Sequence, residues 1–181
     1  MGAVNWIGLG TLYMREVRRF MKVYTQTLVA PVVTTLMFLA IFSLALGGST
    51  RVVAGVAFME FLAPGLIVMA IAQNAFANTS SSILISKMQG NITDSLMPPF
   101  TAHELTFGFA MGGATRGVAV GIVVGVCMTP FLTLEVQHPG FIVYHAVMAS
   151  VMLSLLGTIG GIWSEKFDHI EWVRVPNPAA G

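Results

Sequence analysis

The sequence predicts an all-α, polytopic membrane protein, in which an N-terminal amphipathic interface helix precedes four transmembrane helices. Composition is the first reason: 55% of the residues are hydrophobic, only 9% are charged and the mean hydropathy is +0.80. A soluble domain carries about 25% charged residues, so this chain has too little polar surface for water. The second reason is that four long apolar stretches alternate with polar segments. About 20 helical residues at 1.5 Å each cross a hydrocarbon layer of about 30 Å.

The N-terminal segment Met1–Lys22 has the pattern of an amphipathic helix. Its charges follow its apolar residues and no small-residue cleavage site closes a short core, which argues against a signal peptide. We expect it to lie in the membrane interface, with its cations at the lipid headgroups. The apolar face consists of Trp6, Leu9, Tyr13, Val17 and Phe20, and the basic face of Arg15, Arg18, Arg19 and Lys22.

The four spans are expected at Tyr24–Leu46, Phe61–Ile85, Leu105–Leu134 and Phe141–Trp163. Pro31 lies within the first span, where neighbouring helices can satisfy the carbonyl group that it frees. The second span is polar in its C-terminal half, and we expect this polar face to turn toward protein or a water-filled path rather than lipid. The polar residues are Gln73, Asn74, Asn78, Thr79, Ser80, Ser81 and Ser82.

The third span contains a basic residue and a glycine pattern. Arg116 interrupts the apolar run, and we expect it to lie at the interface or to snorkel toward it. Small residues every fourth position let a neighbouring helix approach closely. Such a ladder serves either packing within the chain or self-association, and the pattern does not distinguish the two. The ladder consists of Gly113, Gly117, Gly121 and Gly125, and Gly157 and Gly161 repeat the spacing in the fourth span.

The distribution of basic residues predicts that the N-terminus is cytoplasmic. This orientation puts most cations inside, leaves Arg51 outside and makes the polar segment 86–104 cytoplasmic. The net charge of +1 gives no reason to expect a nucleic-acid partner. The inside cations are Arg15, Arg18, Arg19, Lys22, Lys87, Lys166 and Arg174.

No catalytic, cofactor-binding or metal-binding residues are predicted. Glu165, Asp168 and His169 have the spacing of a shared helical face, but a solvated helix end explains them without a metal ion. His103 and Glu104 are interpreted as a surface pair. None of the lysines stands in a Walker A motif, so if ATP drives this protein, another chain must bind it.

Several segments together resemble a known family of membrane proteins. They are FLAPGLIVM at 61–69, AFANTSSS at 75–82, KMQGNITDSLMPP at 87–99, ATRG at 114–117 and EKFDH at 165–169. With the basic N-terminal helix, they resemble the type 2 (ABC-2) export permeases of the ATP-binding cassette transporters. The resemblance covers about residues 5 to 169.

The resemblance implies a permease subunit of an ATP-driven exporter in the bacterial inner membrane. Such a subunit forms a homodimer or a heterodimer with a second permease, works with a separate ABC ATPase, and exports lipids, lipid-linked saccharides or drugs. It would itself be neither an enzyme nor a cofactor-binding protein. The alternative is a small membrane scaffold or assembly protein without transport activity, which needs only the glycine ladder.

The resemblance also indicates where the ATPase would dock. Residues 4–22 and 87–104 correspond to the parts that touch the ATPase in such permeases, and a short helix at 91–97 would present apolar side chains to it. The predicted coupling residues are Gln89, Asn91, Ile92, Asp94, Leu96, Met97 and Pro98.

The family has six spans, whereas four are predicted here. We therefore expect residues 1–169 to form an incomplete, C-terminally truncated ABC-2 transmembrane domain. Residues 170–181 would be a disordered or aberrant tail.

Overall fold

The computed structural model describes residues 5–45, 52–53, 55–90, 100–132 and 138–164. Four helices in these ranges are long and apolar enough to cross a membrane, with η1 and α2 counted together as one of them. The predicted all-α polytopic fold is thus confirmed. The elements are α1 (Trp6–Lys22), the π-helix η1 (Thr25–Val29), α2 (Ala30–Ala45), β1 (Val52–Val53), β2 (Val56–Ala57), α3 (Phe58–Met88), α5 (Ala102–Met128) and α6 (Pro139–Trp163).

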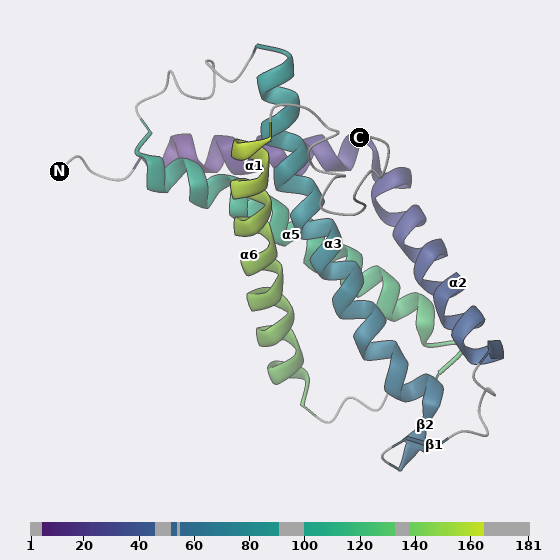
Figure 1. Cartoon of the computed structure of the whole chain (residues 1–181). Coiled ribbons are helices and arrows are strands. Elements are labelled where there is room, and N and C mark those ends of the chain that lie inside the picture. The colour runs from purple at the N-terminus through teal and green to yellow at the C-terminus, as the bar shows by residue number, and fades with distance from the viewer. Residues whose placement is uncertain (1–4, 46–51, 54, 91–99, 133–137, 165–181) are drawn as a thin grey trace, which may run out of the picture.

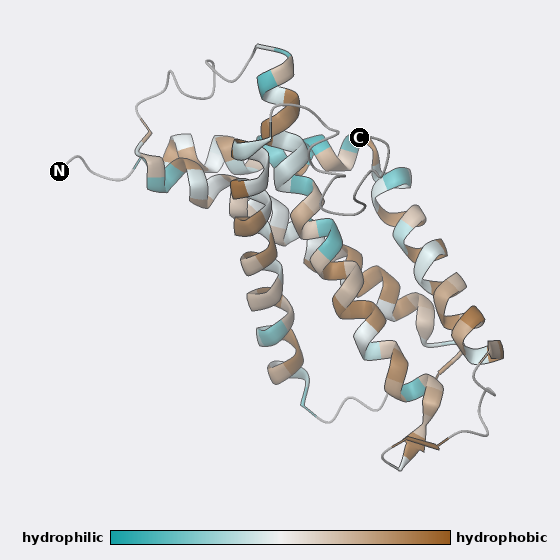
Figure 2. Cartoon of the chain, viewed as in Figure 1, coloured by the Kyte–Doolittle hydropathy of each residue, from teal (hydrophilic) through white to brown (hydrophobic). Residues whose placement is uncertain are grey.

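The helices α3, α5 and α6 pack against one another, and α2 lies against α3 and α5 (Figure 1). The helix α1 runs across the bundle at the end where α3 and α6 finish, and it packs mainly on α5. Colouring by hydropathy separates the two kinds of helix: α2 and α6 are largely apolar, whereas α1 mixes polar and apolar residues (Figure 2). An amphipathic helix lying across apolar helices is the arrangement expected at a membrane interface.

The start of the first span differs from an ideal α-helix. The predicted span Tyr24–Leu46 is one helical stretch from Thr25 to Ala45, but its first turn is the π-helix η1. Pro31 has no N–H to donate to the carbonyl group of Thr27, and a wider turn before it makes room for its ring. After the proline, the hydroxyl of Thr35 donates to the Pro31 carbonyl at 2.6 Å.

The helices α3 and α5 both begin before the predicted spans, but α5 ends at Met128, six residues before the predicted end of the third span at Leu134. The helix α3 begins and ends three residues outside the predicted Phe61–Ile85, and it follows a two-stranded antiparallel hairpin that was not predicted. Gly55 forms the hairpin turn with a φ of 86°, a conformation open to glycine. The helix α5 starts in a capping box: Thr101 accepts from the Glu104 N–H, and the Glu104 carboxylate accepts from the Thr101 N–H at 2.7 Å.

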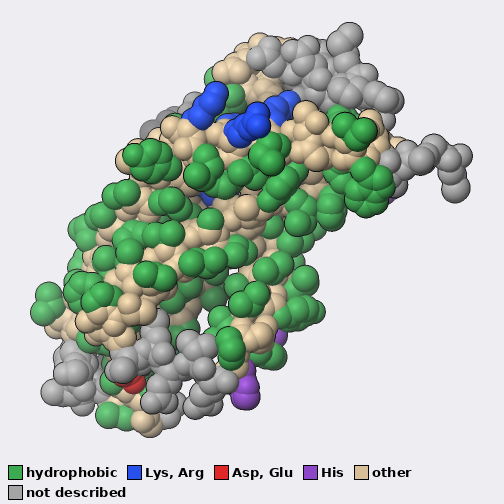
Figure 3. All heavy atoms as spheres, turned by 180° about the vertical axis from the view of Figure 1, so that it is seen from behind, with side chains coloured by type: hydrophobic (Ala, Val, Ile, Leu, Met, Phe, Trp, Pro, Cys, Tyr) green, Lys and Arg blue, Asp and Glu red, His purple; other side chains and the backbone are tan. Residues whose placement is uncertain are grey.

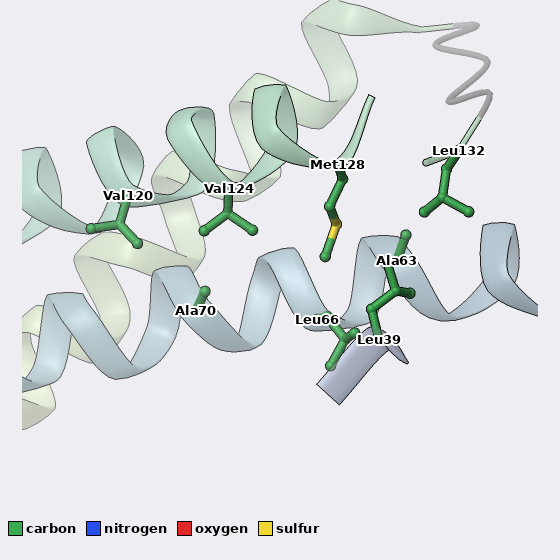
Figure 4. Packing of buried hydrophobic residues seen from close by; sticks show 8 residues of the cluster. All are labelled: Leu39, Ala63, Leu66, Ala70, Val120, Val124, Met128 and Leu132. Carbon is green, nitrogen blue, oxygen red and sulfur yellow. The ribbon is translucent and has the colours of Figure 1, made fainter. Parts of the chain in front are cut away.

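A cluster of buried apolar side chains fills the space among α2, α3 and α5. Figure 4 shows that its members on α3 and α5 face one another along the two helices. Ala63, Val120, Val124 and Met128 are fully buried. Because lipid is as apolar as these side chains, dispersion contacts rather than the hydrophobic effect stabilise such packing. This apolar cluster consists of Leu39, Ala63, Leu66, Ala70, Val120, Val124, Met128 and Leu132.

The glycines of α5 lie where neighbouring helices come closest. A Cβ atom on Gly117 would lie 2.9 Å from the Ile71 carbonyl oxygen of α3, and one on Gly113 would lie 3.0 Å from that of Ala75. A Cβ on Gly121 would also clash with Ile71, but one on Gly125 would have no neighbour nearer than 3.9 Å. The first three glycines thus face helices of the same chain. Gly125 has no such close neighbour within the chain.

Candidate functional site

Basic side chains gather at one end of the molecule. In the space-filling view, the Lys and Arg side chains lie mainly at the end that α1 crosses, while acidic and histidine side chains are visible at the opposite end (Figure 3). Of the basic residues in the described ranges, Arg15, Arg18, Arg19 and Lys22 line one groove beside α1. Lys87, near the end of α3, donates to the Ser164 carbonyl, and Arg116 of α5 donates to Asn74 of α3. This end is the candidate functional site.

The helix α1 is held against α5 by close apolar contacts. Leu12 packs in a small buried cluster with Ile83 of α3 and Phe109 of α5. Two further glycines of α5 make room for α1: a Cβ on Gly112 would lie 2.6 Å from Glu16 Cβ, and one on Gly108 would lie 3.0 Å from Leu12 Cγ. A substitution at either glycine would therefore push α1 away.

A buried carboxylate lies at the centre of the α1 junction. Glu16 is only 1% exposed, and its Oε1 accepts a hydrogen bond of 2.9 Å from the Ser82 hydroxyl of α3. Two arginines of α1 neutralise its charge: Arg19 Nη2 lies 3.2 Å from Oε2, and Arg15 Nη2 lies 3.6 Å from Oε1. A buried charge requires such partners, so this cluster fixes the position of α1 on α3.

The second set of polar contacts joins two arginines to two asparagines on one face of α3. Arg19 Nη2 donates to Asn78 at both its carbonyl oxygen, at 2.7 Å, and its Oδ1, at 3.0 Å. Arg116 Nη2 donates to Asn74 Oδ1 at 3.2 Å. Two expectations are therefore wrong in detail. Arg19 does not point to the headgroups and Arg116 does not snorkel, because the asparagine oxygens offer both guanidinium groups partners inside the protein.

Most polar side chains in the C-terminal half of α3 face other helices of the protein, as predicted. Gln73 is an exception. It is exposed, because successive residues of a helix are about 100° apart and Gln73 therefore lies on a different side of α3 from Asn74 and Asn78. The hydroxyl of Thr79 donates to the Ser154 carbonyl of α6 at 2.9 Å, which ties this face to α6. The buried polar residues of this half are Asn74, Asn78, Thr79, Ser80 and Ser82.

An open groove of about 990 Å³ runs between α1 and the C-terminal end of α3. Trp6, Ile7 and Met14 form an apolar border, and the cations of α1 line the same groove. Gln89, the predicted coupling residue that the structure describes, is exposed and lies at the α3 end of this groove. The groove thus combines positive charge with exposed apolar surface.

The other predicted coupling residues lie outside the described ranges, so their placement stays a prediction. They are Asn91, Ile92, Asp94, Leu96, Met97 and Pro98. Glu165, Asp168 and His169 also lie outside these ranges. Within them, no group of three His, Cys, Asp or Glu side chains could hold a metal ion. Glu104 caps α5 and also accepts from the Asn5 N–H at 2.9 Å.

Sequence reasoning missed Glu16, the central residue of the junction. A signal was present: Glu16 stands four residues after Leu12 and four before Phe20, on the stripe of α1 that the structure buries. A carboxylate on an otherwise apolar stripe indicates a buried partner. The identity of that partner, Ser82, could not be read from the spacing.

Comparison with known proteins identifies the family to which the chain belongs. A family model described as ABC-2 type transporter matches residues 8–173. Proteins named inner membrane transport permease YadH from Escherichia coli (strain K12) and Shigella flexneri are each 35% identical to the chain over 168 residues, which is 93% of this chain. The chain spans 66% of the length of these relatives. No solved structure gives a significant match. Since the family model covers most of the chain, this protein belongs to the ABC-2 type transporter family.

Proposed function

We propose that the chain is the membrane-spanning permease subunit of an ATP-driven exporter and works with a separate ABC ATPase. The observation that carries the proposal is the junction at the basic end, where α1 is joined to α3 and α5 through Glu16 and Arg19. A helix held to α3 by buried polar contacts and to α5 by close packing can pass a displacement from a soluble partner to the spans. A helix that lay on the membrane surface without such contacts could not pass a displacement to the spans.

The ATPase would dock on α1 and the segment 87–104. Gln89 at the end of α3 and the cations of α1 border one groove, so both parts of the proposed dock meet at the same end. The residues proposed to complete it are Asn91, Ile92, Asp94, Leu96, Met97 and Pro98. A homodimer, or a heterodimer with a second permease, would provide two such docks. Lipids, lipid-linked saccharides or drugs are the proposed exported substrates.

The test is co-purification with an ABC ATPase subunit of the same organism. Replacing Ile92 and Leu96 together with Asp introduces two charges at the proposed interface, and we expect the ATPase to be lost from the purified complex while membrane insertion continues. The matched control places two Asp residues at Val52 and Val56, which are exposed in the hairpin at the opposite end of the molecule. If the ATPase co-purifies at normal yield with the Ile92 and Leu96 variant, the dock lies elsewhere. An ATPase that never co-purifies with the unchanged chain would favour a scaffold.

The proposed location is the bacterial inner membrane, with the N-terminus in the cytoplasm. The gathering of cations at the α1 end supports this orientation through the positive-inside rule. Single cysteines introduced at Ser49 or Gln137, in a chain carrying Cys127→Ser, should react with an impermeant thiol reagent in intact cells. A cysteine at Ser95 should stay unlabelled until the cells are opened. Labelling at Ser95 in intact cells would reverse the orientation.

A further inference from the structure

Lys87, in the last turn of α3, ties this helix to the end of α6. Its ammonium group donates to the Ile162 carbonyl and, at 3.2 Å, to the Ser164 carbonyl. The last carbonyl groups of a helix have no partner within the helix, and the helix dipole favours a cation beside them. Lys87 is therefore a cap for α6 that another helix supplies.

Close packing joins the same two helices next to Lys87. A Cβ atom on Gly157 of α6 would lie 2.5 Å from the Phe76 carbonyl oxygen of α3, and one on Gly161 would lie 2.9 Å from that of Ser80. Such packing resists a closer approach of the helices, whereas lipid offers equivalent contacts when they separate. The hydrogen bonds of Lys87 resist separation. The end of α6 therefore follows the end of α3 whether α3 pushes or pulls.

Two hydroxyl groups hold the middle of α6 on α5. Ser150 donates to the Ala114 carbonyl at 2.9 Å and Ser154 to the Ala110 carbonyl at 2.7 Å, and both serines are fully buried. By contrast, every residue from 139 to 145 is exposed, and α6 stands apart from α3 toward this end (Figure 1). The described part of the chain thus holds α6 by its C-terminal half and leaves its first two turns exposed.

These contacts give α6 the geometry of a lever with its pivot at the two serines. At 1.5 Å per residue, about 12 Å of helix lies between Ser154 and Ile162, and about 16 Å lies between Pro139 and Ser150. A rigid helix that tilts about such a pivot moves its two ends by similar amounts in opposite directions. A displacement of the α3 end would therefore reach the far end of α6 almost undiminished.

We propose that Lys87 is the positioning residue through which a displacement of the segment 87–104 tilts α6. The inference rests on the proposed function, because the ATPase supplies the displacement of this segment. Lys87 is the first residue of the segment, and its ammonium group is bound to α6. This route differs from that of α1, whose contacts lie on α3 and α5.

The link between Lys87 and α6 is tested on the full chain alone, in detergent, by hydrogen/deuterium exchange. Lys87→Met keeps a long side chain but removes the donor. The amides in the last turn of α6 should then lose protection by about two- to fivefold, as expected when a cation leaves a helix C-terminus. Lys87→Arg keeps charge and donors and should retain the protection. Ile162→Ala is the matched control, since it removes an exposed side chain but keeps the accepting carbonyl. Unchanged protection in Lys87→Met would overturn the proposal.

The tilt is tested in the complex with an ABC ATPase subunit. Spin labels at Tyr144 of α6 and Val126 of α5, both exposed, report the distance between the two helices in a chain carrying Cys127→Ser. ATP should shift this distance in the unchanged chain, in Lys87→Arg and in Ile162→Ala. In Lys87→Met most of the shift should disappear while the ATPase still co-purifies. A purely structural role of Lys87 would leave the response to ATP intact.

The outcomes separate this proposal from the proposed function. An equal shift in Lys87→Met and in the unchanged chain would overturn the tilt, as would a bound ATPase that causes no shift at all. Loss of the ATPase from Lys87→Met would mean that Lys87 contacts the ATPase rather than α6, which also refutes the proposal. An ATPase that never binds the unchanged chain would refute the proposed function. The exchange result would still decide whether Lys87 holds α6 to α3.

Discussion

The two ends of the helix bundle are held together by different kinds of contact. At one end, the apolar cluster around Met128 and Val124 consists of aliphatic side chains with no polar contact. At the other, Glu16, Arg19 and Asn78 form directional hydrogen bonds and ion pairs between α1 and α3. In lipid, aliphatic packing gains only dispersion energy, whereas a buried ion pair must keep its partners. The comparison suggests that the apolar end sets the packing of the spans and that the polar end fixes the position of α1.

The largest effect is expected from Glu16→Gln, which removes the buried negative charge that pairs with Arg19 and Arg15. The free energy of unfolding should fall by about 3 kcal/mol, the lower end for a broken buried pair, because both arginines are partly exposed. Thermal unfolding in detergent measures the loss, and limited proteolysis within α1 should speed up. Glu104→Gln is the matched control, since glutamine also suits a capping box. Equal stability of the Glu16 and Glu104 variants would mean that the buried carboxylate of Glu16 does not hold α1 in place.

A smaller effect is expected from Met128→Ala in the apolar cluster. Met128 is fully buried, so its removal leaves a cavity, and we expect a loss of about 2 kcal/mol, at the lower bound for such truncations because lipid competes for the contacts. Proteolysis of α1 should stay unchanged, in contrast to Glu16→Gln. Val126→Ala on the exposed side of α5 should be neutral. Faster cleavage of α1 in the Met128 variant would show that the two ends are coupled.

The smallest effects are expected in the glycine ladder, where adding one methyl group should affect stability differently at Gly117 and at Gly125. Gly117→Ala would place a Cβ 2.9 Å from both the Ile71 carbonyl oxygen and Ala75 Cβ, so stability should fall by about 1 kcal/mol. Gly125→Ala meets nothing nearer than 3.9 Å and should be neutral or stabilise α5 by a few tenths of a kcal/mol. Thermal unfolding of both variants under the same conditions checks this. The reverse order would place Gly125, rather than Gly117, at the tight contact.

The sequence predicts the spans well because hydropathy and helix length are local properties. The fourth span was expected at Phe141–Trp163 and forms α6 from Pro139 to Trp163. Contacts between helices are less predictable, since they depend on which faces meet. Arg116 shows why: its position in an apolar run suggests snorkelling, and only the facing Asn74 of α3 explains why it stays inside.

The position of α1 on α5 has a consequence for synthesis of the protein. The glycines that receive α1, Gly108 and Gly112, are made almost a hundred residues after Leu12 and Glu16. While the ribosome is still producing α5, the emerging N-terminal helix lacks the α5 part of its docking surface and must wait at the membrane surface. Glu16 and Arg19 are three residues apart and can pair within the nascent helix before Ser82 and Gly112 exist. This local pair would shield the carboxylate during the delay, so that α1 closes onto the bundle late, as one of the last steps of assembly.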